Sequence, residues 1–256
     1  MSAITAQELE SQMPDATKLL SDEPEMESSL HYTQLLLLVT SLEWAWRQRD
    51  DFFIGANLTI YFSRQQLKHR DFRGPDFFLV KNTTGHPRSS WVVWEEDGRY
   101  PDLIIELLSE STAKVDRTTK LDLYATRFHT PEYFYFSPET LEFAGFRLNF
   151  NQYSPIPPNE QGWLWSEALG FFLGIHHGQL RYFSLEGMLV STPEEAAQQE
   201  MFRADQAMAR AHQETQRAER EFARAPQEAE RADQEKSRAD RLAAKLRKLG
   251  LNPDEA

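Results

Sequence analysis

The sequence predicts a mixed α/β (α+β) fold, in which a mixed β-sheet is flanked by helices and followed by a long C-terminal α-helix. Three observations support this class. An apolar pattern with helical spacing comes first, short strand-like segments follow it, and a seven-residue repeat fills the last quarter of the chain. Strands interspersed with helices are typical of a sheet that has helices packed against it. Because 40% of the 256 residues are apolar, the chain can bury a sizeable core.

These patterns divide the chain into three parts. Residues 1–26 are polar and acidic, and they are interpreted as a flexible N-terminal arm. Residues 27–190 carry the helix and strand patterns and are interpreted as the folded domain. Residues 193–250 carry the repeat and are predicted to form a coiled coil or a single helix.

The first helix is predicted at residues 28–49. Four apolar residues recur there at spacings of three and four, and so share one face of a helix: Leu35, Leu38, Leu42 and Trp46. Short β-branched or aromatic segments predict strands at 57–62, 76–80, 90–94, 103–108, 132–136, 141–148, 171–175 and 180–183. The proline-rich residues 152–158 are expected to form a surface loop.

A second helix is expected after the strand at residues 103–108. Asp116 is a residue type that caps helix N-termini, and Thr130-Pro131 is expected to end the helix. Its apolar face is formed by Leu121, Tyr124 and Phe128.

The C-terminal repeat is an Arg-Ala pair that returns every seven residues. It stands at 203–204, 210–211, 217–218, 224–225, 231–232 and 238–239. The most apolar seam joins these alanines to Met208, Thr215, Phe222, Ala229, Lys236 and Ala243. Pro226 has no backbone N–H and is expected to break or kink the helix near Ala225. The repeat is compatible with an arm that pairs with a copy of itself or with another protein, and equally with a solvated single helix.

Charge and composition limit the possible functions. The formal net charge is -12, and the first 192 residues hold 26 acids against 16 bases. This balance argues against non-specific nucleic-acid binding, which depends on Lys and Arg, but clustered carboxylates suit a divalent cation. The absence of cysteine excludes disulfides and thiolate metal sites. The longest apolar run, residues 35–39, is far shorter than the roughly 20 residues of a membrane span, so we expect a cytoplasmic protein.

Carboxylates in two strand-like segments are the best candidates for chemistry. Asp76 and Asp102 each follow a proline at the start of a predicted strand, and Glu106 lies within the second apolar run. A carboxylate buried there needs a positive partner, which is either a Lys or Arg in a structural pair or a bound cation. A Pro-Asp pair alone is commonly turn chemistry.

Asp76 and Glu106 are suited to share one Mg²⁺ if their strands are neighbours, with water completing the octahedron. Lys120, on the second helix, is then placed to stabilise the charge of a transition state, with Tyr124 one turn further on the same face. The alternative for Lys120 is an ordinary surface lysine. His31, His176 and His177 lack zinc-ligand spacing and are interpreted as structural. The six tryptophans are expected in the core or at the sheet edge, although Trp163 and Trp165 are compatible with a groove that stacks bases.

The run PDLIIELLSESTAKVDRTTKLDLYATRFHTPEYFYFSPET, residues 101–140, resembles the signature of the Uma-two endonuclease family. The matching residues are Pro101, Asp102, Glu106, Ser109, Ser111, Thr112, Asp116, Lys120, Tyr124, Pro131, Glu132 and Tyr133. Upstream, Pro75-Asp76 and the pair Glu27 and His31 also fit the family pattern. The resemblance covers roughly residues 20 to 190.

The resemblance implies a restriction-endonuclease-like domain of the PD-(D/E)XK superfamily over residues 27–190. It implies a Mg²⁺- or Mn²⁺-dependent nuclease acting on nucleic acid, with DNA the expected substrate. Asp76 and Glu106 are then the metal-binding acids, Lys120 the catalytic lysine, and Glu27 an outer metal ligand. Asp102 and Tyr124 are supporting residues. The superfamily usually places its lysine two residues after the second acid, where this chain has Leu108; Lys120 is expected to replace it from the adjacent helix.

Three hypotheses follow. The first is a metal-dependent endonuclease. The second is a nuclease-derived fold without activity that acts as an interaction module through its C-terminal helix. The third, a purely structural coiled-coil scaffold, leaves the carboxylates in the sheet unexplained. The first two differ in whether Asp76, Glu106 and Lys120 converge on one point.

Overall fold

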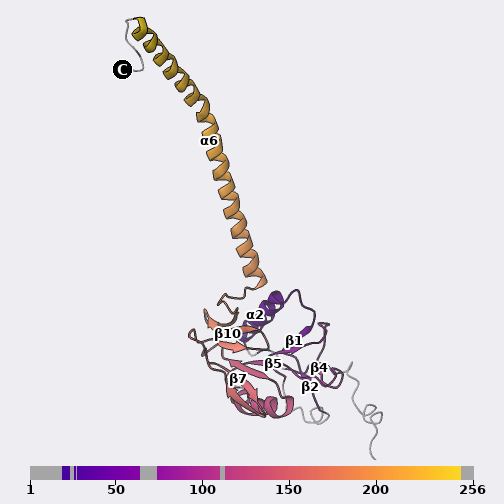
Figure 1. Ribbon diagram of the computed structural model, residues 1–256. Coiled ribbons are helices and arrows are strands. Elements are labelled where there is room, and N and C mark those ends of the chain that lie inside the picture. Colours follow the sequence, from indigo (N-terminus) through magenta and orange to yellow (C-terminus); the bar gives the residue numbers. More distant parts are fainter. Residues whose placement is uncertain (1–18, 24–25, 27, 64–73, 110–112, 249–256) are drawn as a thin grey trace, which may run out of the picture. The chain divides into compact units, whose positions relative to one another are not determined.

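A computed structural model of the protein describes residues 19–23, 26, 28–63, 74–109 and 113–248. The chain divides into two compact units, Met1–Glu194 and Glu195–Ala256. The first contains all the strands described below (Figure 1). It is a mixed α+β structure, as the sequence predicts.

A six-stranded mixed sheet forms the centre of the first unit. Its strand order is β1-β3-β5-β6-β7-β8. The strands are β1 (Phe52–Ala56), β3 (Phe77–Lys81), β5 (Leu103–Leu107), β6 (Glu132–Phe136), β7 (Phe143–Asn149) and β8 (Gln152–Pro155). The central pair β5 and β6 is parallel, and the other neighbours are antiparallel. All five side chains of β5 are buried, which accounts for its nearly continuous apolar sequence.

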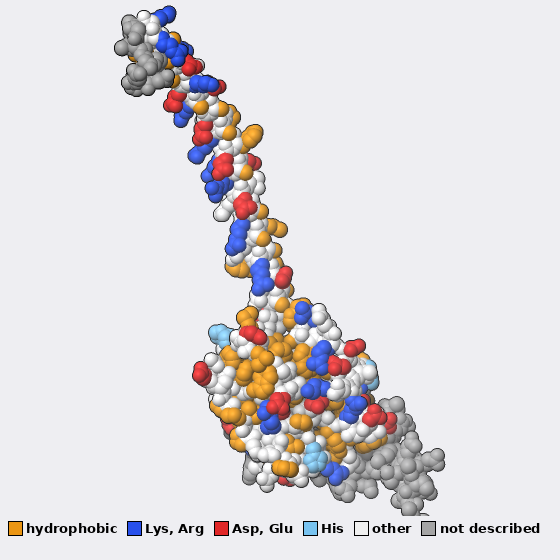
Figure 2. All heavy atoms as spheres, in the orientation of Figure 1, with side chains coloured by type: hydrophobic (Ala, Val, Ile, Leu, Met, Phe, Trp, Pro, Cys, Tyr) orange, Lys and Arg blue, Asp and Glu red, His pale blue; other side chains and the backbone are white. Residues whose placement is uncertain are grey.

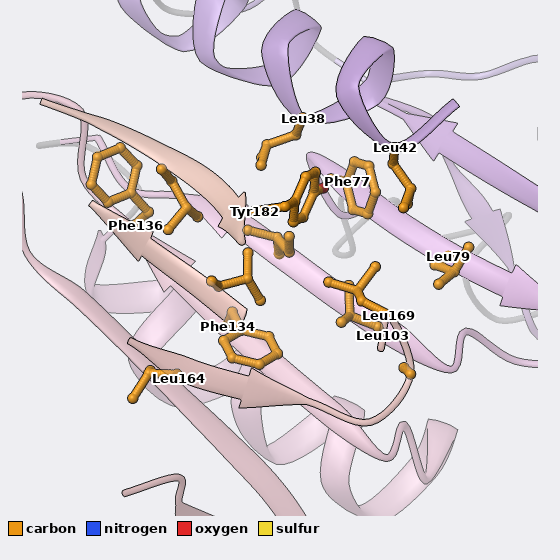
Figure 3. Packing of buried hydrophobic residues seen from close by; sticks show 14 of the residues in the cluster. Leu38, Leu42, Phe77, Leu79, Leu103, Phe134, Phe136, Leu164, Leu169 and Tyr182 are labelled. Atoms are coloured by element: carbon orange, nitrogen blue, oxygen red, sulfur yellow. The ribbon is translucent and has the colours of Figure 1, made fainter. Parts of the chain in front are cut away.

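Helix α2 (Ser29–Ala45) and a second sheet cover one face of the central sheet. Ser28 caps α2 by accepting a hydrogen bond from the His31 N–H. Leu38 and Leu42 point from α2 toward Phe77 and Tyr182 (Figure 3). The covering sheet has the order β11-β10-β9 and consists of β9 (Leu164–Ser166), β10 (Phe171–His176) and β11 (Gln179–Phe183). The predicted apolar face of the first helix is confirmed, and the helix ends at Ala45 rather than at Arg49.

A helical segment covers the opposite face of the central sheet. It consists of α4 (Ala113–Val115), η2 (Asp116–Lys120), α5 (Leu121–Leu123) and η3 (Tyr124–Phe128), where η2 and η3 are π-helical turns. Tyr124 and Phe128 pack there with Phe78, Ile104 and Tyr133. The segment ends at His129, whose φ of 52° is left-handed. The prediction that Asp116 caps this helix is wrong, because Asp116 lies inside the segment with its side chain buried.

Several predicted strand bounds need correction at the periphery. The expected strand 57–62 is reduced to β2 (Ile60–Tyr61). Asn57 has a left-handed φ of 47°, and its N–H donates to the Asp76 carbonyl next to the last pair of β1 and β3. The expected strand 90–94 is reduced to β4 (Trp91–Val92), which pairs with β2. Residues 152–158 are not only a loop, since Gln152–Pro155 form the edge strand β8. Proline is tolerated on such an edge.

The C-terminal helix α6 (Pro193–Lys248) is continuous over 56 residues. The expected break at Pro226 is wrong: the helix runs through this residue, which lies inside it. None of its described side chains is buried, and acidic and basic side chains alternate along its length (Figure 2). An ion pair between Arg217 and Glu221, one turn apart, illustrates how such a helix stabilises itself. Within the described part of the chain, no helix combines the length and apolarity needed to cross a membrane.

Candidate active site

The strand register places Asp76 beside Glu106. In the antiparallel pair of β3 and β5, Phe77 lies opposite Ile105 and Phe78 opposite Ile104. The next pair in this register is Asp76 and Glu106. Side chains alternate along a strand, so both carboxylates project to the face where Phe78 and Ile104 contact the helical segment.

Hydrogen bonds hold the two acids together. The Asp76 N–H donates to Glu106 Oε2 at 3.3 Å, and the Leu107 N–H donates to Asp76 Oδ2 at 2.7 Å. The carboxylate of each acid thus accepts a hydrogen bond from the backbone at or next to the other acid. The side chain of Glu106 is fully buried, whereas Asp76, at the start of its strand, is partly exposed.

The helical segment supplies the groups that face these acids. Lys120 Nζ lies 2.9 Å from Glu106 Oε1, and the Tyr124 hydroxyl donates to the same oxygen at 2.8 Å. The structure therefore brings together Asp76, Glu106, Lys120 and Tyr124 from three separate segments of the sequence.

Asp116 is a further member of the site. Asp116 lies one helical turn before Lys120, and its Oδ1 is 2.9 Å from Lys120 Nζ. The side chain of Asp116 is almost completely buried. We interpreted it as a helix cap from the sequence. Its position four residues before a lysine, where helical side chains meet, is the signal that identifies it as a partner of Lys120.

Burial and charge act in opposite directions on these groups. Burial raises the pKa of Glu106 well above its usual value, and the Lys120 ammonium only partly offsets this effect. Burial also raises the pKa of Asp76 against the opposing charge of Lys120. Burial alone lowers the pKa of Lys120, but Glu106, Asp116 and Asp76 outweigh it and raise that pKa above its ordinary value. Lys120 is therefore a cation beside Glu106 and Asp76, two acids that hold their protons more tightly than usual.

Comparison with known proteins identifies the family. A sequence model of the Uma2 (Uma-two) family, described as "Putative restriction endonuclease", matches residues 9–179, which is more than half of the chain. The chain belongs to the Uma2 family. A solved structure from Anabaena variabilis ATCC 29413, described as "a putative nuclease belonging to DUF820", is similar with a TM-score of 0.41 and 13% sequence identity. The alignment covers 57% of this chain and 76% of that chain. No curated protein matches the chain.

In this Uma2 protein, the expected supporting residue Asp102 is not part of the cluster. Asp102 precedes β5, whereas Glu106 lies near its other end, so four residues of extended chain, roughly 13 Å, separate them. The carboxylate of Asp102 accepts the Lys81 N–H at 2.7 Å, which fixes the strand pair β3 and β5. Asp102 is thus a structural residue here. Glu27, expected as an outer metal ligand, lies outside the described residues.

Leu108 stands two positions after Glu106, where the superfamily usually has its lysine. Its contacts are those of a structural residue. The side chain of Leu108 is buried, and its carbonyl faces His31 Nε2 at 3.1 Å. His31 is itself buried and contacts Ser28 through Nδ1. The interpretation of His31 as structural agrees with these contacts, which tie α2 to the end of β5.

Proposed function

We propose that this Uma2 protein is a divalent-metal-dependent endonuclease that hydrolyses phosphodiester bonds in nucleic acid, with DNA as the expected substrate. The observation that carries the proposal is the convergence of two acids on adjacent strands, Asp76 and Glu106, with the ammonium of Lys120. Membership of a family described as a restriction endonuclease supports the same reaction class.

The charge of the cluster fits a divalent cation. Three carboxylates surround one ammonium, so the fully ionised cluster has an excess of two negative charges. Burial is the main cause of the raised pKa values of Asp76 and Glu106, and the neighbouring acids add to it. A divalent cation would neutralise these two negative charges, so the carboxylates would not need to take up protons. Among the described residues, no group of three or more His, Asp or Glu side chains is arranged to hold a metal ion. The pair Asp76 and Glu106 nevertheless fits Mg²⁺ or Mn²⁺, because Mg²⁺ is commonly held by one or two carboxylates plus water and substrate phosphate.

Each residue has a distinct role in this proposal. Asp76 and Glu106 would hold the cation, which when bound supplies a water of lowered pKa and neutralises phosphate charge. Lys120 provides a fixed positive charge for the extra negative charge of the phosphorane-like transition state. Tyr124 donates its hydroxyl to Glu106 Oε1 and so fixes the orientation of that carboxylate. The raised pKa of Lys120 favours this electrostatic role over that of a general base.

The alternative function is an inactive nuclease-like fold that acts as a protein-interaction module through α6. Two observations favour it: the acidic balance of the first 192 residues, and the exposed apolar side chains of α6 such as Met208 and Phe222. Pairing of α6 with a copy of itself or with another protein stays a prediction.

A substitution at the first acid tests the proposal. We expect Asp76→Asn to lose Mg²⁺-dependent cleavage of a labelled DNA duplex and to lose Mg²⁺ binding in calorimetry. Asp102→Asn serves as the matched control, because it removes an acid at the other end of the same strand pair and should leave both properties intact. Equal cleavage by wild type and Asp76→Asn would exclude Asp76 from the mechanism. A parallel single-stranded RNA substrate distinguishes between DNA and RNA.

A further inference from the structure

Asp116 is a buried acid that the proposed reaction does not require as a metal ligand. We infer that Asp116 is a positioning residue, which holds the ammonium of Lys120 in place beside the carboxylate pair. The effect of Asp116 on catalysis rests on the proposed function. Its effect on the position of Lys120 does not, because that contact exists in the protein without metal or substrate.

The geometry places the lysine between two carboxylates from different elements. Lys120 Nζ lies 2.9 Å from Asp116 Oδ1 on its own helical segment and 2.9 Å from Glu106 Oε1 on β5. The side chains of Glu106 and Asp116 are both at most 1% exposed, and that of Lys120 is 11% exposed. Asp116 Oδ1 meets Lys120 as an ion pair without hydrogen-bond geometry. Attraction between opposite charges is strong in such a low-dielectric setting.

Asp116 is itself held firmly. The hydroxyl of Tyr133, a fully buried residue of β6, donates to the Asp116 backbone carbonyl at 2.9 Å. This bond fixes the start of the π-helical turn η2 against the sheet. An acid anchored in this way provides a rigid reference point for Lys120.

The helical geometry keeps three functional side chains on one face. Asp116, Lys120 and Tyr124 are spaced by four residues, and in a regular α-helix each such step turns the side chain by about 40°. Over two steps the three side chains would spread over about 80°. The wider π-helical turn η2, which runs from Asp116 to Lys120, reduces this spread, and all three side chains are buried. Such turns occur frequently at functional sites.

The need for Asp116 follows from charge. A cation bound by Asp76 and Glu106 repels the ammonium of Lys120 and competes with it for Glu106. Asp116 contacts the same ammonium and is not one of the two proposed metal ligands, so it provides an attraction for Lys120 that does not depend on Glu106. Without it, Lys120 would lose its position when the metal binds.

The first test measures the restraint directly, without activity. In the full chain labelled with ¹⁵N-lysine, the ammonium signal of Lys120 is assigned by its loss in Lys120→Arg. We expect Asp116→Asn to accelerate hydrogen exchange of this ammonium roughly tenfold or more, as for the loss of a strong charge-assisted contact. Asp122→Asn, which removes an exposed acid from the same segment, is the control and should leave the exchange unchanged. Exchange as slow in Asp116→Asn as in wild type would overturn the inference.

The second test is a double-mutant cycle in DNA cleavage. We expect Asp116→Asn to lower kcat about 10- to 100-fold with KM nearly unchanged, and to have no further effect in the Lys120→Ala background. Losses that multiply in the double variant would contradict a role through Lys120 and indicate a merely structural one. If wild type does not cleave, the proposed function fails, and the exchange measurement alone decides whether Asp116 positions Lys120.

Discussion

Glu106 illustrates at the scale of a single residue how burial and chemistry are linked. An acid in a central strand is costly to ionise, and this one is accommodated by Lys120, by the Tyr124 hydroxyl and by the Asp76 N–H. A lysine alone would suffice for a structural pair. The additional acids Asp76 and Asp116 leave the cluster with more negative than positive charge, which is the property that a cation site needs.

Replacing this acid should separate function from stability. We expect Glu106→Gln to weaken Mg²⁺ binding by about 100-fold or more, because losing a metal ligand has a larger effect than losing a residue that only orients a ligand. The fold should persist, because Lys120 keeps its contact with Asp116. Calorimetry and circular dichroism measure the two properties. A Glu106→Gln variant that binds Mg²⁺ like wild type would remove Glu106 from the site.

The effect of Mg²⁺ on stability should depend on pH. The raised pKa values of Glu106 and Asp76 mean that the folded, metal-free protein keeps protons which the unfolded chain has already released. The stability that they contribute is complete below the ordinary carboxyl pKa and is lost as pH rises through the raised values. Mg²⁺ competes with these protons, so its stabilising effect grows over the same range.

We therefore expect Mg²⁺ to raise Tm more at about pH 8 than at about pH 5. Thermal unfolding with and without Mg²⁺ measures this difference, and Glu106→Gln should greatly reduce it. An equal Mg²⁺-induced shift at both pH values in wild type would contradict the proposed ligands.

The candidate site could be predicted in part from the sequence. Asp76 and Glu106 stood out because acids are unusual next to apolar strand segments. Lys120 was a candidate from its place on the second helix, and the family resemblance supported it. Their convergence could not be predicted, since it depends on the register of β3 and β5. Asp116 was misinterpreted because an Asp near the start of a helical pattern is typical of a cap.

At the scale of elements, the buried centre was predictable and the periphery was not. The predicted strands 103–108 and 132–136 agree with β5 and β6 because their side chains are almost wholly buried and apolar. The strands β1 and β9 were missed: β1 lies at the edge of its sheet and is mostly half-buried, and β9 has only three residues. Their pairing depends on partners distant in sequence rather than on a local pattern.

Pro226 offers a test of the long helix. A proline inside a helix costs about 3 kcal/mol relative to alanine, because it removes a hydrogen bond and its ring crowds the preceding turn. We expect Pro226→Ala to raise the melting temperature of α6, followed by circular dichroism of the full chain. Gln227→Ala is the neighbouring control, with a small change in helix propensity. Identical melting of the two variants would show that Pro226 does not limit the stability of α6.

At the scale of the whole molecule, charge and organisation point in different directions. The first 192 residues are strongly acidic, which disfavours general attraction to DNA. Under the proposed function, affinity for a phosphate must therefore come from the bound cation and from Lys120. Under this proposal we expect the cluster of one ammonium and three acids to act only with a metal bound.

The measurement that tests this account most directly is cleavage of supercoiled plasmid by the full chain. Mg²⁺ or Mn²⁺ is compared with EDTA, and wild type is compared with Lys120→Ala. We expect metal-dependent nicking by wild type and a loss of about 100-fold or more in the variant, the scale of losing one electrostatic group in an active site. Absence of cleavage by well-folded wild type with either metal would contradict the nuclease and favour the interaction module.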